Sequence, residues 1–131
     1  MRVKDLDGRF YNWPPTGCVP PKTDEVGKSS YHIKCRNLLQ TLHPTRRIME
    51  EVPIPGHRLF LDFYIPHRQV AIEVQGEQHF KYIPHFHGTK LGFFEAQQRD
   101  RTKAEWCILN EIDLIELRYD EDEESWLKKI V

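Results

Sequence analysis

Two segments of alternating apolar and polar residues, joined by a four-residue turn, constrain the fold of this chain more than any other feature. Residues 58–65 and 70–75 both follow the period of two that is typical of β-strands. Pro66–Gln69 between them is rich in turn-forming residues. The pattern therefore predicts a β-hairpin. One face would carry Leu59, Leu61, Phe63 and Ile65, and the other Phe60, Asp62 and Tyr64.

The register of this hairpin brings two acidic residues together. If Ile65 pairs with Val70, Asp62 pairs with Glu73, and their Cβ atoms lie about 5 Å apart on one face. Two carboxylates at that distance repel each other unless a cation lies between them. Gln75 follows on the same face and adds a further oxygen. The set is suited to Mg²⁺, whereas the alternative is a solvated sheet face on which water screens the charges.

The flanking sequence predicts further elements around the hairpin. Helices are expected over 29–42, 91–110 and 125–130, and strands over 48–54 and 113–119. This order is typical of an α/β domain with a small mixed sheet flanked by helices. Residues 1–28 are rich in turn formers and predict an irregular N-terminal arm, with a short strand at Arg9–Trp13. The domain itself would span 29–131.

Composition excludes several classes of protein. With 39% hydrophobic and 30% charged residues, the 131-residue chain has the profile of one globular domain rather than of a disordered segment. No apolar run approaches the roughly 20 residues of a membrane span, so we expect no membrane association. The net charge of −1 includes the wholly acidic run 120–124, which leaves the remainder mildly basic. Three scattered cysteines predict a reducing, cytoplasmic location.

Other polar residues complete a candidate catalytic set. Gln97, Asp100 and Lys103 stand one turn apart along the predicted helix 91–110. His79 follows the second hairpin strand closely. Metal-assisted phosphodiester hydrolysis uses carboxylates for the ion, a lysine or glutamine to orient water, and a histidine as acid, base or phosphate contact. The residue types therefore indicate that class of chemistry.

Four segments carry a resemblance to a known family. They are Leu-Asp-Phe-Tyr-Ile-Pro at 61–66, Ala-Ile-Glu-Val-Gln-Gly-Glu-Gln-His-Phe at 71–80, Gln-Arg-Asp-Arg-Thr-Lys at 98–103 and Asn-Glu-Ile-Asp-Leu-Ile-Glu-Leu at 110–117. Together they resemble the PD-(D/E)XK nuclease superfamily, in the branch that contains very-short-patch repair endonucleases and the EDxHD homing endonucleases of phages and bacteria. The resemblance covers residues 29–119 and implies a single restriction-endonuclease-like domain that acts on DNA.

The resemblance also implies roles for individual residues. Asp62 would be the central metal ligand, and Glu73 a second ligand or the holder of a metal-bound water. The metal would be Mg²⁺, with Mn²⁺ able to substitute. His79 matches the family histidine and Asp100 its late acidic residue.

The chain departs from the family pattern at two places. The usual lysine of the second strand is Gln75 here, so Lys103 would have to supply the positive charge. The first helix lacks the glutamate that the branch often uses. His32, or Glu50 or Glu51 from the next strand, could take that outer position.

The expected function is that of a Mg²⁺-dependent DNA endonuclease, working in the cytoplasm of a bacterium or a phage-infected cell. A homodimer or a partner protein would provide specificity for a long site. A non-catalytic nucleic-acid-binding module is one alternative, favoured by Gln75. A zinc-stabilised interaction domain is another, in which His79, His85 and His87 would share the metal with a cysteine, and the candidates are Cys18, Cys35 and Cys107.

Overall fold

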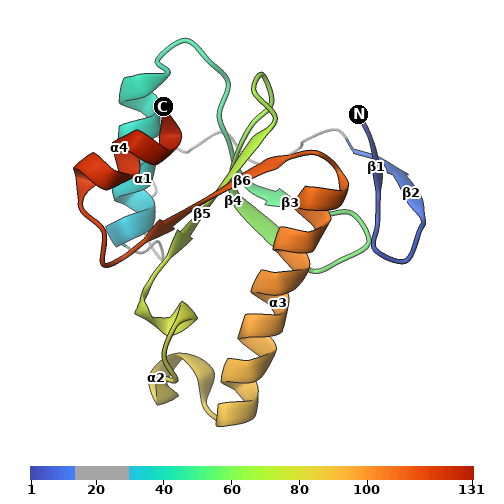
Figure 1. Ribbon diagram of the computed structural model, residues 1–131, viewed down its shortest axis with the longest axis vertical. Helices are drawn as coiled ribbons and strands as arrows, with labels where there is room; N and C mark the ends of the chain where they lie inside the picture. The colour runs from blue at the N-terminus through green and yellow to red at the C-terminus, as the bar shows by residue number, and fades with distance from the viewer. Residues whose placement is uncertain (14–29) are drawn as a thin grey trace.

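The computed structural model describes residues 1–13 and 30–131 and is built on a four-stranded mixed sheet (Figure 1). The strands lie in the order β3-β4-β5-β6. Neighbours β3, β4 and β5 are antiparallel, and β6 is parallel to β5. The predicted fold class, a small mixed sheet flanked by helices, is confirmed. The strands are β3 (Met49–Pro53), β4 (Phe60–Ile65), β5 (Val70–Gln75) and β6 (Asp113–Arg118).

Helices cover both faces of this sheet (Figure 1). Helices α1 (Ser30–Leu42) and α4 (Glu123–Ile130) pack on one face through an apolar cluster that contains Leu39 and Trp126. On the other face, α3 (Lys90–Leu109) packs through a second cluster that contains Trp106. Val70, Ile72 and Val74 of β5 face α1 and α4, whereas Ala71 faces α3. Burial on both faces explains why β5 reads as an almost continuous apolar run.

The N-terminal segment is more ordered than the sequence predicts. Strands β1 (Arg2–Lys4) and β2 (Phe10–Asn12) form an antiparallel hairpin, so the prediction of an irregular arm is wrong for residues 1–13. Apolar burial is the reason, because Trp13 is only 3% exposed and its ring packs against those of Tyr64 and Trp106. The predicted strand at 9–13 matches β2. Residues 14–28 of the predicted arm lie outside the described residues.

Helix α3 is anchored in the apolar core at its C-terminal end. Its two buried residues, Trp106 and Cys107, lie in the last turn, while its first half extends beyond the sheet beside α2 (Pro84–His87) (Figure 1). The predicted loop 77–88 is thus partly helical, since it also contains the 3₁₀ turn η1 (Glu77–His79). Helices with the length and apolar character to cross a membrane are absent from 1–13 and 30–131.

The start of α4 corrects a small prediction. The helix begins at Glu123, two residues before the expected Ser125. Asp122 caps it, because its carboxylate accepts a hydrogen bond of 2.8 Å from the Ser125 N–H. Acidic residues in the first turn and Lys128 and Lys129 in the last turn also suit the helix dipole.

Candidate metal centre and substrate pocket

The hairpin of β4 and β5 has the predicted register, and it opens at Asp62. Main-chain pairing runs from Ile65–Val70 to Phe63–Ile72 and stops there. Side chains then replace the ladder. The Asp62 N–H donates to Glu73 Oε2 at 2.9 Å, and Asp62 Oδ2 accepts from the Val74 N–H at 2.9 Å. The two carboxylates therefore lie next to each other, as the alternation predicts. Each accepts a hydrogen bond from a main-chain N–H of the opposite strand, at the point where the two strands separate.

Strand β4 changes face at the same point. Phe63 and Ile65 belong to the cluster under α1 and α4, whereas Leu59 and Leu61 pack in the cluster under α3. The prediction that Leu59 and Leu61 share a face with Phe63 is therefore wrong. In a regular strand, residues two apart point the same way, so the chain must twist between Leu61 and Phe63. Asp62 occupies this switch.

The neighbouring strand β3 switches in step. Glu50 pairs with Phe63 and Val52 with Leu61, which sets Glu51 opposite Asp62. Glu51 has a φ of 54°, in the left-handed region that few residues other than glycine adopt. Such backbone strain costs about 1–3 kcal/mol and is most often found at functional sites. Its effect here is to direct two facing carboxylates, Glu51 and Asp62, into the same hollow.

Lys103 supplies the positive charge beside the carboxylates. Its Nζ lies 2.8 Å from Glu73 Oε1, and the side chains are 17% and 9% exposed respectively. Burial lowers the pKa of Lys103, but Glu73, Asp62 and Asp100 raise it more, so that the amine stays charged. Burial and the nearby Glu73 carboxylate hold the pKa of Asp62 well above its usual range, against the opposing effects of the Val74 N–H and Lys103. One lysine thus leaves this carboxylate pair short of positive charge.

A histidine and an aspartate form a second pair on the far side of the pocket. His79 Nδ1 lies 2.8 Å from Asp100 Oδ2, and both side chains are roughly three-quarters buried. This bond fixes the orientation of the ring and leaves Nε2 without a hydrogen bond to any described residue. A histidine held in this way can exchange a proton at Nε2. The expected neighbour of Asp100, Lys103, contacts Glu73 instead.

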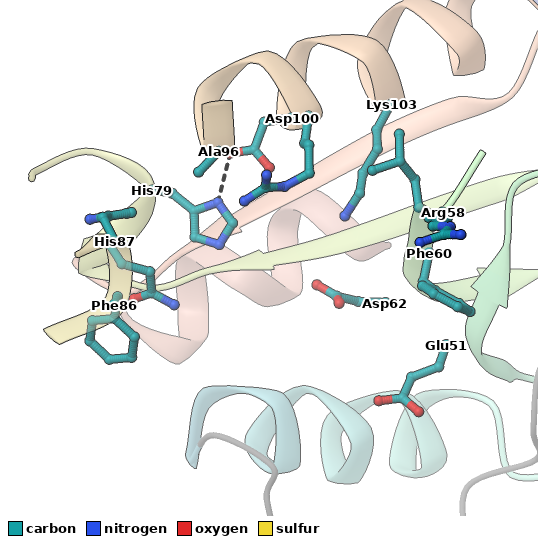
Figure 2. Close-up of a pocket in the computed structure, with 13 residues that line it drawn as sticks. Glu51, Arg58, Phe60, Asp62, His79, Phe86, His87, Ala96, Asp100 and Lys103 are labelled. Atoms are coloured by element: carbon teal, nitrogen blue, oxygen red, sulfur yellow. Dashed lines mark hydrogen bonds and ion pairs between the residues drawn. The ribbon is translucent and has the colours of Figure 1, made fainter. Parts of the chain in front are cut away.

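These groups border a pocket of about 550 Å³ between β4, α2 and α3 (Figure 2). Asp62 points into it from β4, and the His79–Asp100 pair and Lys103 lie along its opposite wall. Glu73 itself does not line the pocket, but its ion pair with Lys103 connects it to the pocket wall. The lining residues are Glu51, Arg58, Leu59, Phe60, Asp62, Gln78, His79, Phe86, His87, Ala96, Arg99, Asp100 and Lys103.

A glycine allows α2 to form one side of this pocket. A Cβ atom at Gly92 would collide with the main-chain oxygen of His87. The close approach packs α2 on the first turn of α3, where Thr89 caps the helix through the Gly92 N–H at 3.1 Å. Phe86 and His87 are thereby held at the pocket. His85, the other histidine of α2, is exposed and does not line it.

Four residues of the predicted set do not line the pocket: Glu73, Gln75, Gln97 and His32. Gln75 is 7% exposed, and its amide donates to Glu116 on β6. It is therefore not placed to orient a water in the pocket, contrary to the prediction. Gln97 is exposed and does not line the pocket. The residues of α3 that line it are 96, 99, 100 and 103, and the direction of Gln97 lies to one side of this row on the helix.

His32 belongs to a separate buried cluster. It pairs with Glu50, and its ring stacks on Phe63 with centroids 4.6 Å apart. Arg36 donates to both carboxylate oxygens of Glu50, at 3.1 and 2.8 Å. His32 and Glu50 therefore pair with each other away from the pocket, and of the three candidates for the outer position Glu51 alone lines it.

Sequence reasoning assigned no role to six residues that line the pocket, namely Arg58, Phe60, Gln78, Phe86, Ala96 and Arg99. Arg58 and Phe60 precede Asp62 at spacings of two, so strand alternation could have indicated them. Arg99 lies one turn before Lys103, which is a comparable helical signal. Phe86 had no such signal, because its position depends on how α2 packs on α3.

The predicted zinc alternative is not supported within the described residues. Cys35 and Cys107 are both fully buried, in separate core clusters on opposite faces of the sheet. Burial raises the pKa of the Cys107 thiol to about 12. Neither cysteine lines the pocket that His79 and His87 border, and Cys18 lies outside the described residues. In the same described part of the chain, no three His, Cys, Asp or Glu side chains group as metal ligands.

Comparisons with known proteins find viral relatives. The chain is 43% identical over 61 residues to uncharacterized protein 307L of invertebrate iridescent virus 6, covering 47% of this chain and 31% of the relative. It is 30% identical over 109 residues to uncharacterized protein 033L of invertebrate iridescent virus 3, covering 79% and 54%. Uncharacterized protein 094L of frog virus 3 is 37% identical over 81 residues, covering 60% and 52%.

The match thus spans 31% to 54% of the length of these three relatives, and their names state no activity. No protein-family model and no solved structure matches the chain.

Proposed function

We propose that this protein is a divalent-metal-dependent endonuclease that hydrolyses phosphodiester bonds in DNA, with the PD-(D/E)XK type of active site. The observation that carries the proposal is the Asp62–Glu73 pair at the point where β4 and β5 separate. It lies beside Lys103 at a pocket bordered by arginines. Two carboxylates that share a single lysine favour a further cation.

The donor set fits Mg²⁺. This ion is commonly held by one or two carboxylates, and water and substrate phosphate complete its octahedron. A third protein ligand is therefore not required. Asp62 would provide the main ligand through Oδ1, since its Oδ2 accepts the Val74 N–H. Glu73 would bind directly or through water. When bound, the ion would activate water and stabilise charge on the phosphate.

The protein groups divide the remaining work. Lys103 neutralises charge next to Glu73, where a lysine from the second strand stands in the resembled family. His79 Nε2, oriented by Asp100, is placed to hold or deliver a proton at the pocket wall. Arg58 and Arg99 supply positive charge for phosphates on either side. Specificity for a long site would come from a homodimer or a partner protein.

A second candidate is binding of nucleic acid without cleavage. The observation that favours it is that both oxygens of Glu73 already have a partner within the protein, Lys103 for Oε1 and the Asp62 N–H for Oε2. These contacts compete with a metal ion for the same carboxylate. The first candidate predicts cleaved DNA when a divalent ion is added, and the second predicts DNA that is bound but intact. One assay therefore separates them.

The test is cleavage of supercoiled and linear DNA by protein stripped of metal. We expect activity with Mg²⁺ or Mn²⁺, none in EDTA, and binding with little turnover in Ca²⁺, because oxygen ligands select hard cations. Glu105→Gln is the matched control, since this carboxylate is exposed on α3 outside the pocket. Undiminished cleavage in EDTA would contradict the metal mechanism. Mg²⁺-independent binding without cleavage would favour the second candidate.

A further inference from the structure

Two exposed phenylalanines stand beside the candidate metal centre. Phe60 on β4 is 51% exposed and Phe86 on α2 is 61% exposed, and both line the pocket. In Figure 2 they lie on opposite sides of Asp62. Packing does not require either ring in this position, since both are absent from the two core clusters. Each leaves an aromatic face open to the pocket.

Unneutralised cations accompany these rings. Arg58 and Arg99 line the same pocket, and both side chains are exposed. Neither guanidinium forms an ion pair with any residue in 1–13 or 30–131, whereas Lys103 is held by Glu73. Free guanidinium groups next to flat aromatic faces match two parts of a nucleotide, the phosphate and the base.

The geometry points to a specific form of DNA. In a duplex, each base is covered on both faces by its neighbours, so a protein aromatic ring cannot stack on it without displacing one. Single-stranded DNA exposes base faces, and aromatic stacking is a usual way to bind it. A pocket of about 550 Å³ is also in the range that encloses a small group such as a nucleotide.

We infer that the pocket binds unpaired DNA, with the phosphate next to Asp62 and flanking bases stacked on Phe60 and Phe86. The inference rests on the proposed function for its choice of DNA as the polymer, and it names the substrate class as a single strand or a single-stranded stretch within a larger DNA. Arg58 and Arg99 contact the backbone phosphates. Stacking makes the binding selective for unpaired bases, and the arginines make it sensitive to salt.

The test compares a labelled 20-nucleotide single strand with the same strand in a duplex, using fluorescence anisotropy in Ca²⁺. The variants are Phe60→Leu, Phe86→Leu and the double substitution, which keep apolar bulk but remove the ring. Phe94→Leu is the matched control, because Phe94 is 54% exposed on α3 and lies outside the pocket. Thermal unfolding of each variant establishes that the fold is kept.

We expect wild-type protein to bind the single strand more tightly than the duplex. The double variant should weaken single-strand binding by at least about tenfold, the scale of losing base stacking, with an unchanged salt dependence. Phe94→Leu should bind as wild type. Arg58→Ala and Arg99→Ala should instead reduce the slope of log affinity against log salt.

Two results would overturn the inference: tighter binding of the duplex, or full single-strand affinity in the double variant. Failure of the proposed function looks different. If Phe-dependent binding is found but Mg²⁺ produces no cleavage, the nuclease proposal falls and the binding site stands. If Asp62-dependent cleavage of duplex DNA proceeds without any role for the rings, the nuclease stands and this inference falls.

Discussion

Two clusters of charged side chains lie next to each other in the sheet, one around Glu50 and the other around Asp62 and Glu73. Their negative charges are neutralised to different extents. Glu50, 2% exposed, accepts two bonds from Arg36 and pairs with His32. Burial raises the pKa of Glu50, but Arg36 and His32 lower it further, to a value below the ordinary one. Among the described residues, the one ion pair to the Asp62–Glu73 carboxylates is that of Lys103 with Glu73, and the pKa of Asp62 is raised by burial and by Glu73.

The difference separates a structural ion pair from a candidate site. In the Glu50 cluster the carboxylate pairs with the fixed positive charge of Arg36, and both side chains are buried. The Asp62 cluster has fewer cations than carboxylates and opens into a pocket. An unbalanced pair of carboxylates costs folding stability, and such pairs are found mainly at functional sites, where a bound cation can neutralise them.

The largest effect should come from Asp62→Asn. The substitution keeps the size of the side chain and the acceptor for the Val74 N–H. It removes the charge that would hold the metal, so we expect a loss of at least about 1,000-fold in cleavage rate, the upper range for losing one preorganised electrostatic group. Single-turnover assays at saturating Mg²⁺ measure this loss. A variant that cleaves at the wild-type rate would remove Asp62 from the mechanism.

Glu50→Gln should have the opposite profile. It removes the buried carboxylate charge that accepts two hydrogen bonds from Arg36 and pairs with His32, so we expect a loss of about 3 kcal/mol in the free energy of unfolding. Chemical denaturation measures this change. At temperatures well below the midpoint of unfolding, the folded fraction should cleave at a rate close to that of wild type. A selective loss of cleavage without a loss of stability would show that the two clusters are not functionally distinct.

Lys103→Ala should lower the cleavage rate by about 100-fold, the usual scale for one electrostatic contact at a reacting centre. Gln75→Ala provides the comparison and should cost less than about threefold, because its amide is bonded to Glu116 outside the pocket. Single-turnover rates for both variants test the assignment. Equal losses would mean that Gln75 acts on the pocket from its position behind β5.

The smallest expected effect is a pair of opposite pH dependences of stability in metal-free buffer. The raised pKa of Asp62 stabilises the fold below its ordinary value of 3.8, and this contribution is lost as the pH rises through the folded value. Asp62→Asn should therefore gain stability relative to wild type as the pH rises above about 4, because the variant carries no charge to bury beside Glu73.

Glu50 has the reverse sign. Its lowered pKa stabilises the fold above 4.5, and this contribution is lost as the pH falls through the folded value. The deficit of Glu50→Gln should therefore shrink in acid. Thermal unfolding from pH 3 to pH 8 measures both differences, and slopes of the same sign would contradict the distinction between the two clusters.

The sequence predicts the hairpin and its register because both depend on local features. A four-residue turn fixes which residues face each other, and so the Asp62–Glu73 juxtaposition could be derived from the residue pattern. Helical spacing likewise placed Asp100 and Lys103 on one side of α3. Their partners were not predictable in this way, because each depends on how α3 lies over the sheet.

The face switch in β3 and β4 could not be predicted for a physical reason. Leu61 is equally apolar on either face of the sheet, so its identity does not indicate which cluster it joins. Glutamate is not a residue that marks a left-handed backbone, and the φ of Glu51 therefore had no sequence signal. Only the tertiary bonds around Asp62 determine where the alternation breaks.

The burial of the C-terminal turn of α3 in the core has a mechanical consequence for the pocket. The helix is fixed by Trp106 and Cys107, while Ala96 and Asp100 line the pocket up to ten residues nearer the N-terminus, a lever of about 15 Å. A tilt of only about 5° at the anchored end would move the far end by more than about 1 Å. A change in packing at Trp106, which does not line the pocket, would therefore be transmitted along the helix to the pocket wall.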